Sequence, residues 1–326
     1  MRDPLKPKSR RWLSFALRLA VTTALLLLIG QSIDFKTVSK LLSGVQPRYL
    51  GIALALLLAV RLLMAIRWYC LLRAFAIDES FASVLNVFFV SSFLGLFLPG
   101  IIGADLIRGY PMMRTSGRTN EVAATLVLDR YVGVLSLSAF AFVGVLLVGD
   151  RTTAWWTPLL SFLVVGGSVL SGLALFADRI VRTLARWNDA TKRLRTLGAR
   201  VLRLARMLTN REALLPVMPS IFGLSFAVLT LRALVFYYLF RAFQAEVSLI
   251  DCLAFVPVVF LVMMAPVSIG GLGVREGSLV MLFTSVSWEA AVSVGLASQF
   301  LQLLASAPGA VSWLATGRSA KAGRGE

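Results

Sequence analysis

LFLPGIIGADLIRGY at residues 96–110 and MMAPVSIGGLGVREG at residues 263–277 are two versions of one pattern, and they decide the fold that the sequence predicts. Each version interrupts an apolar segment with proline and glycine and places a charge just beyond the interruption. In a membrane protein, such paired interruptions at corresponding positions of two halves indicate a transporter's binding site. At an offset of 167 residues, the matched pairs are Pro99 with Pro266, Ile102 with Ile269, Gly103 with Gly270, and Arg108 with Arg275.

A second match lies upstream of each interruption. YCLLRAFAIDESF at residues 69–81 corresponds to YYLFRAFQAEVSL at residues 237–249, with the same Arg-Ala-Phe-x4-Ser spacing. Apolar segments share few residue types, so chance similarity is the alternative, but the spacing of the polar residues favours a duplication. We therefore predict two pseudo-repeat halves, at about residues 50–148 and 214–316, within one integral membrane domain that spans residues 1–326.

The composition excludes an ordinary soluble domain. Hydrophobic residues make up 58% of the 326 residues, and the mean hydropathy is +0.82, values typical of a polytopic α-helical membrane protein. The net charge of +17 lies in segments that flank apolar runs, so it does not indicate nucleic-acid binding. The sequence contains no histidine, and its two cysteines, Cys70 and Cys252, lack metal-type spacing. We expect no metal site and no cofactor.

The hydropathy pattern predicts six full spans and two broken segments. The broken segments cover roughly residues 81–113 and 248–287, around the two interruptions. The first apolar run follows a basic N-terminus, is too long for a signal peptide's core and lacks a clear cleavage site, so we expect it to remain as a transmembrane helix. The expected full spans are residues 12–31, 50–66, 121–148, 155–177, 214–240 and 289–316.

Basic residues predict how these spans are oriented. The positive-inside rule places the N-terminus, the arginines that follow the first interruption, loop 179–211 and the C-terminal tail in the cytoplasm. Six spans satisfy all four placements only if each broken segment enters and leaves on one side, the first from the cytoplasm and the second from the opposite face. We thus expect an all-α bundle with two inverted re-entrant hairpins, although the basic outside loop at residues 32–49 runs against the rule.

Loop 179–211 is strongly basic, with ten of the 33 lysines and arginines. Leucines and valines recur at near-helical spacing among these arginines, which suits a helix on an anionic membrane surface. Anchoring by the positive-inside rule explains the same charge, and the sequence leaves both readings open.

Charged residues inside apolar spans are costly and face a cavity or a partner. Asp129 and Arg130 are the sharpest case. Neighbours on a helix point about 100° apart, so these two side chains cannot form an ideal pair with each other. We expect Asp129 to pair with Arg108 or Arg275, either within a binding site or as a structural ion pair. Asp105 and Arg108 are three residues apart and share a helix face.

Other charges carry weaker signals. Arg275 and Glu276 repeat the combination of both signs in the second half, and Arg232 lies in the middle of an expected span. For Arg232, snorkelling and a structural role remain equally open. Arg61 and Arg67 lie at the expected cytoplasmic end of their span, where anchoring at the interface suffices to explain them.

The interruptions themselves predict a cavity. Lipid cannot satisfy free backbone groups, so such breaks occur where protein or a wet cavity surrounds them, although tight surface loops are the alternative. The candidate binding residues are Asp105, Arg108, Asp129, Arg130, Arg275 and Glu276. The residues expected to shape the hairpin backbone are Pro99, Gly100, Gly103, Pro266, Gly270, Gly271 and Gly273.

The motifs PGIIGADLIRGY, LDRYVG and PVSIGGLGVREG resemble the flippase-like integral membrane family, also known as the transmembrane region of lysylphosphatidylglycerol synthase. That family includes the flippase half of the bacterial multiple peptide resistance factor. The resemblance covers about residues 12–316, and Ala104 replaces a glycine of the common first loop. It implies a lipid-handling membrane protein with two re-entrant hairpins, but it does not fix the lipid. Because the chain ends soon after its last expected span, we expect no aminoacyl transferase.

The leading hypothesis is a transporter or flippase for a lipid, or a lipid-linked anionic headgroup, across the bacterial inner membrane by alternating access. Arg108 and Arg275 would bind phosphate, and the carboxylates would orient them or carry protons. No ATP-binding loop is present, and no nucleophile–base pair indicates an enzyme. Expected partners are a phospholipid or polyprenyl-linked lipid, with a second copy or an envelope enzyme left open. A lipid-modifying enzyme and a non-transporting regulatory subunit remain alternatives.

The sequence also predicts how two variants should behave. Asp129→Asn or Arg275→Ala should abolish transport while membrane expression stays near normal.

Overall fold

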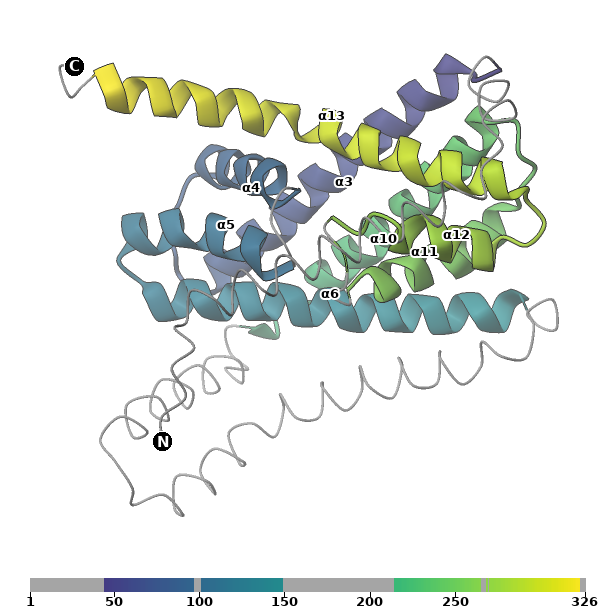
Figure 1. Ribbon diagram of the computed structural model, residues 1–326. Coiled ribbons are helices and arrows are strands. Elements are labelled where there is room, and N and C mark those ends of the chain that lie inside the picture. The colour runs from purple at the N-terminus through teal and green to yellow at the C-terminus, as the bar shows by residue number, and fades with distance from the viewer. Residues whose placement is uncertain (1–43, 97–100, 149–213, 265–267, 269, 323–326) are drawn as a thin grey trace, which may run out of the picture.

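Helices account for all regular secondary structure in the residues that the computed structural model describes, which are 44–96, 101–148, 214–264, 268 and 270–322. Some of these helices are long, and others are short and lie beside the interruptions (Figure 1). Their bounds are α3 Pro47–Ala74, α4 Phe81–Gly95, α5 Ile101–Ser116, α6 Thr119–Val148, α10 Met218–Ala242, α11 Leu249–Met263, α12 Val274–Leu282 and α13 Trp288–Ala322.

Four of the helices are long and apolar enough to cross a membrane, which confirms the expectation of a polytopic helical membrane protein. They are α3, α6, α10 and α13, and they coincide with four of the six expected spans. The expected spans at 12–31 and 155–177 and the basic loop at 179–211 lie outside the described residues.

Both interrupted segments form a helix, a break and a second helix. α4 ends at Gly95 and α5 begins at Ile101, while α11 ends at Met263 and α12 begins at Val274. Pro99, Gly100 and Pro266 lie outside the described residues. Gly103 falls within α5, and the residues before α12 turn with positive φ at Gly270, Gly271 and Gly273 (63°, 76° and 81°), a backbone conformation that favours glycine.

The Arg-Ala-Phe-x4-Ser pattern builds the same turn twice. After α3 the chain takes a positive φ of 53° at Ala76, and after α10 it takes 57° at Gln244. Ser80 then caps α4 by accepting a hydrogen bond from the Ser83 N–H, and Ser248 caps α11 by accepting one from the Ile250 N–H. The match in sequence therefore reflects a match in local structure.

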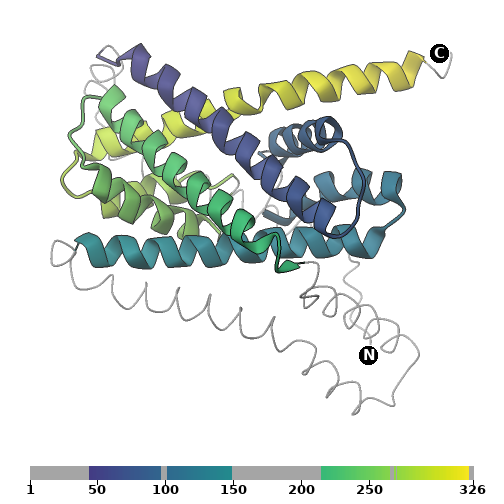
Figure 2. The same ribbon diagram turned by 180° about the vertical axis from the view of Figure 1, so that it is seen from behind.

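Helices of the first half pack mainly against helices of the second half. α3 and α10 lie against each other along the bundle (Figure 2). α4 from the first interrupted segment packs on α13, and α11 from the second packs on α6. In Figure 1, α6 and α13 run along opposite sides, with α4 and α5 toward one end and α11 and α12 toward the other.

The apolar interior consists of two clusters. One gathers buried residues of α3, α4, α5 and the first half of α6, with Trp68, Leu71 and Leu72 fully enclosed. The other gathers buried residues mainly of α10, α11, α12 and α13, with Phe240 against Phe283 at a ring-centroid distance of 4.7 Å. Each cluster thus holds one interrupted segment in place, and the charged residues described next come from helices of both.

Candidate functional site

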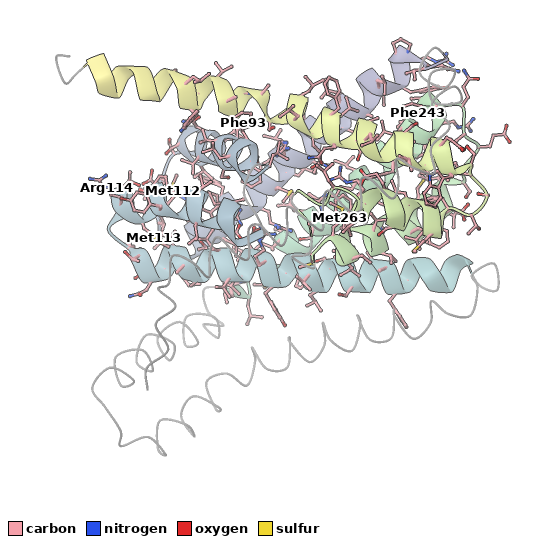
Figure 3. All side chains as sticks on the ribbon, viewed as in Figure 1. Phe93, Met112, Met113, Arg114, Phe243 and Met263 are labelled. Atoms are coloured by element: carbon pink, nitrogen blue, oxygen red, sulfur yellow. The ribbon has the colours of Figure 1, made fainter. Side chains whose placement is uncertain are left out.

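A cavity of about 360 Å³ opens among the helices and reaches both interruptions. Met263, at the end of α11, lies on its wall and near the middle of the molecule, far from Met112, Met113 and Arg114 on α5 (Figure 3). Lining residues come from α3, α4, α5, α6, α10, α11, α12 and α13 and from the turn before α12. Its charged lining residues are Arg67, Asp105, Arg108, Asp129, Arg130, Arg232 and Arg275.

Asp129 pairs with two of the arginines that line the cavity. Its side chain is 3% exposed, and its two carboxylate oxygens accept from two arginines, Arg67 Nε at 2.8 Å and Arg108 Nη2 at 2.7 Å. Arg67 also donates to Ser225 Oγ of α10 at 3.0 Å. These charge-assisted hydrogen bonds link α3, α5, α6 and α10 at one point. The expected pairing of Asp129 with Arg108 is confirmed, whereas Arg275 does not contact Asp129.

Asp105 continues the row of ion pairs toward the surface. It accepts from Arg108 Nη2 at 2.9 Å and from Arg130 Nε at 2.6 Å. This confirms that Asp105 and Arg108 share a helix face. The five charges form an alternating chain, Arg67–Asp129–Arg108–Asp105–Arg130, which runs from a buried end at Arg67 to a half-exposed end at Arg130. Alternation places every charge of the chain beside one of opposite sign.

Aromatic side chains fix the middle of the chain of charges. The Arg108 guanidinium lies 4.9 Å from the Trp68 ring centre and 5.7 Å from that of Phe88. The Trp68 indole in turn donates to Thr125 Oγ1 at 3.2 Å. Arg108 is therefore clamped by two carboxylates and two rings, which suits a structural brace better than a group that must release and bind a ligand.

The interpretation of Arg67 as an interface anchor is wrong. The helix that carries it runs on to Ala74, so Arg67 lies about two turns inside the end of α3 rather than at its edge. The residue is only 5% exposed and its charge is paired within the protein. Arg73, the one basic residue further along α3, could have signalled this longer helix, but the pairing itself depends on helix packing.

The second interruption is built differently. Arg275 is 1% exposed and donates to Gln299 Oε1 at 2.7 Å, to Ser298 Oγ at 3.2 Å and to the Gly270 carbonyl at 3.3 Å. Among the described residues, no carboxylate lies within 4.0 Å of its guanidinium. Its Nε is buried without an acceptor there. Among the described residues, the Arg275 guanidinium therefore donates only to neutral acceptors.

Glu276 does not orient Arg275. It points to the start of its own helix, where one carboxylate oxygen accepts from the Gly273 N–H at 2.6 Å, and it is not part of the cavity lining. Gly295 of α13 leaves room for this carboxylate, because a Cβ there would lie 2.8 Å from Glu276 Cγ. Its position indicates a helix cap rather than a ligand contact.

The two halves consequently differ in charge compensation. The first-half arginines that line this cavity, Arg67, Arg108 and Arg130, share two aspartates, whereas Arg232 and Arg275 of the second half form no ion pair among the described residues. Five arginines and two aspartates line the cavity, an excess of three positive charges. A cavity with this excess of positive charge favours an anionic ligand. In the part of the chain that the structure describes, no group of three metal-ligating side chains is present.

Comparison with known proteins agrees with this picture of a membrane protein. The family model described as the lysylphosphatidylglycerol synthase TM region matches residues 15–309. The chain belongs to that family. The match includes both interruptions and every charged residue of the cavity wall, so the resemblance expected from the motifs is confirmed. Among curated proteins, none matches the chain.

Proposed function

We propose that this member of the lysylphosphatidylglycerol synthase TM region family translocates a lipid with an anionic headgroup across the bacterial inner membrane. The observation that carries the proposal is the cavity, which touches both interruptions and holds five arginines against two aspartates. Its volume of about 360 Å³ suits a headgroup, while acyl chains would stay among the apolar outer faces of the helices. The proposal includes no chemical change to the lipid.

Inverted repeats would supply the mechanism. The packing is reciprocal between the halves. α4 of the first half packs on α13 of the second, just as α11 of the second half packs on α6 of the first. Met64 and Arg232, which are 168 residues apart and occupy equivalent positions, meet at 3.4 Å between Met64 Sδ and Arg232 Nη2. A two-fold axis brings equivalent residues face to face in this way. Two such halves that rock against each other would expose the cavity alternately to each side.

The topology that this mechanism needs has a direct test. We propose that the two interrupted segments are re-entrant from opposite faces and that both termini are cytoplasmic. Thr119, at the start of α6, and Ser285, in the turn between α12 and α13, are both exposed and lie at corresponding places in the two halves. In a background without Cys70 and Cys252, Thr119→Cys should react with an impermeant maleimide from the cytoplasm and Ser285→Cys from the periplasm. Reaction of both from one face contradicts the inverted arrangement.

Arg275→Ala is expected to slow translocation roughly 10- to 100-fold, because one charge-assisted hydrogen bond to the headgroup would be lost. The measurement is lipid movement in liposomes by purified protein, with fluorescent phosphatidylglycerol, its aminoacylated form and a polyprenyl phosphate. Arg114→Ala, which removes an exposed arginine on α5, is the matched control and should move lipid at the wild-type rate.

Other outcomes of this assay would replace the proposal. Recovery of a chemically altered lipid would indicate an enzyme. If folded wild-type protein moves none of the three lipids, a role as a partner of an envelope enzyme becomes the better account. Wild-type movement that Arg275→Ala leaves unchanged would remove Arg275 from the binding site.

A further inference from the structure

A second, smaller cavity of about 130 Å³ adjoins the large one and shares Arg232 with it. α3, α4, α10, α11 and α13 enclose it. Its polar lining consists of Arg61, Arg232, Ser92, Ser298 and Gln302, and the rest is apolar. Two arginines therefore face a small space that no acidic residue of the described part of the chain lines.

Arg232 is poorly compensated. Its guanidinium lies 4.5 Å from the centre of the Phe260 ring, and among the described residues its hydrogen-bond acceptor is Met64 Sδ, a weak acceptor, at 3.4 Å. No carboxylate of the described residues lies within 4.0 Å of it. A guanidinium carries five N–H donors, so Arg232 retains donors for a planar or tetrahedral oxyanion.

Arg61 has the same deficit. Its Nη2 donates to the Gln302 carbonyl of α13 at 3.1 Å, while its Nε is buried with no acceptor among the described residues. A buried charge without a counter-charge is unfavourable, and two of them beside one cavity are more so. The arginines Arg67 and Arg108, by contrast, are already occupied by Asp129. Arg61 and Arg232 are therefore the arginines that can still bind an anion.

We propose that the small cavity is a phosphate subsite, in which Arg61 and Arg232 bind the phosphate ester of the transported molecule. The proposal rests on the proposed function. A volume of about 130 Å³ is enough for a phosphate group, since it is roughly that of four water molecules. The phosphate occupies the small cavity and the remainder of the headgroup extends into the large one past Arg232. The side-chain amide of Gln302 offers a further donor to the cavity.

The test measures binding separately from transport. Purified protein in neutral detergent is titrated with short-chain phosphatidylglycerol, with glycerol 3-phosphate and with an uncharged diacylglycerol of the same chains. Arg232→Met and Arg61→Met remove one cation each, and methionine is the residue that stands opposite Arg232 at the equivalent position. Arg241→Met, which alters an exposed arginine on the same helix, is the control.

We expect each cavity variant to weaken phosphatidylglycerol binding at least tenfold and to lower its salt dependence, while Arg241→Met binds as wild type. Tight binding of glycerol 3-phosphate would assign the subsite to a soluble phosphate ester, whereas binding that needs the acyl chains assigns it to a lipid. Wild-type affinity in both folded cavity variants overturns the subsite. If wild type binds phosphatidylglycerol through these arginines but moves no lipid, the subsite stands and the proposed function fails.

Discussion

Asp129→Asn is expected to destabilise the folded protein by about 3–5 kcal/mol, the range found when one partner of a buried ion pair is removed. Asp129 carries two buried arginines on its two oxygens, at 2.8 Å from Arg67 and 2.7 Å from Arg108. An asparagine offers one neutral oxygen and turns an N–H donor toward the other guanidinium. Arg67 would keep its charge without a counter-charge, and Arg108 would keep only its pair with Asp105. The measurement is the temperature at which the detergent-solubilised protein loses its monodisperse peak.

A matched control separates burial from charge. Asp78→Asn makes the same chemical change in an ion pair with Arg73 whose side chains are 89% and 51% exposed. Water and salt screen such a pair, so this variant should unfold at the wild-type temperature. Equal stability of the Asp78 and Asp129 variants would show that the Asp129 carboxylate is not paired as the structure has it.

A second substitution should recover part of the loss. Arg67→Met in the Asp129→Asn background removes the cation that has lost its carboxylate partner, so the double variant should be more stable than Asp129→Asn alone. Because the residues are in contact, the effects of the single variants should not add. The sequence alone predicted near-normal expression for Asp129→Asn. The two arginines on one carboxylate lead us to expect reduced expression instead.

The sequence located the charged residues of the cavity well because proline, glycine and charge within apolar runs leave strong local signals. Asp105, Arg108, Asp129 and Arg130 were all singled out, and all four lie in one chain of ion pairs. Spacing within one helix was enough to place Asp105 and Arg108 on one face. The interruptions also fell where the pattern placed them, between α4 and α5 and between α11 and α12.

What the sequence could not supply depends on which helices pack together. Arg67 became a partner of Asp129 because α3 runs two turns past its expected end and lies beside α6. Glu276 follows Arg275 in the chain, yet it bonds to the backbone at the start of its own helix. Arg61 and Arg232 face the same small cavity because α3, α10 and α13 pack together, and no local sequence pattern reveals this packing.

Gly309→Ala is expected to destabilise the protein by roughly 1–3 kcal/mol or more, the usual cost of overpacking a close contact. Gly309 of α13 crosses α4 so closely that an added Cβ would collide with the main chain of Phe89 and lie 2.7 Å from the Val90 nitrogen. Main-chain atoms in the middle of a helix cannot move aside as a side-chain tip can. The two helices must separate, which opens the wall of α4 residues beside the cavity. Small residues at helix crossings serve this role in membranes.

Gly223→Ala is the matched control and should not destabilise the protein. A Cβ at Gly223 of α10 meets nothing within 4 Å, and alanine favours a helix over glycine by up to about 1 kcal/mol. Gly144→Ala tests the corresponding crossing of α6 and α11, where the added Cβ would lie 2.5 Å from Ala254 Cα. We therefore expect Gly309→Ala and Gly144→Ala to lower the unfolding temperature together while Gly223→Ala leaves it unchanged or raises it. Similar stability in all three variants would show that α13 and α6 do not cross their partners at the closeness that the cavity wall requires.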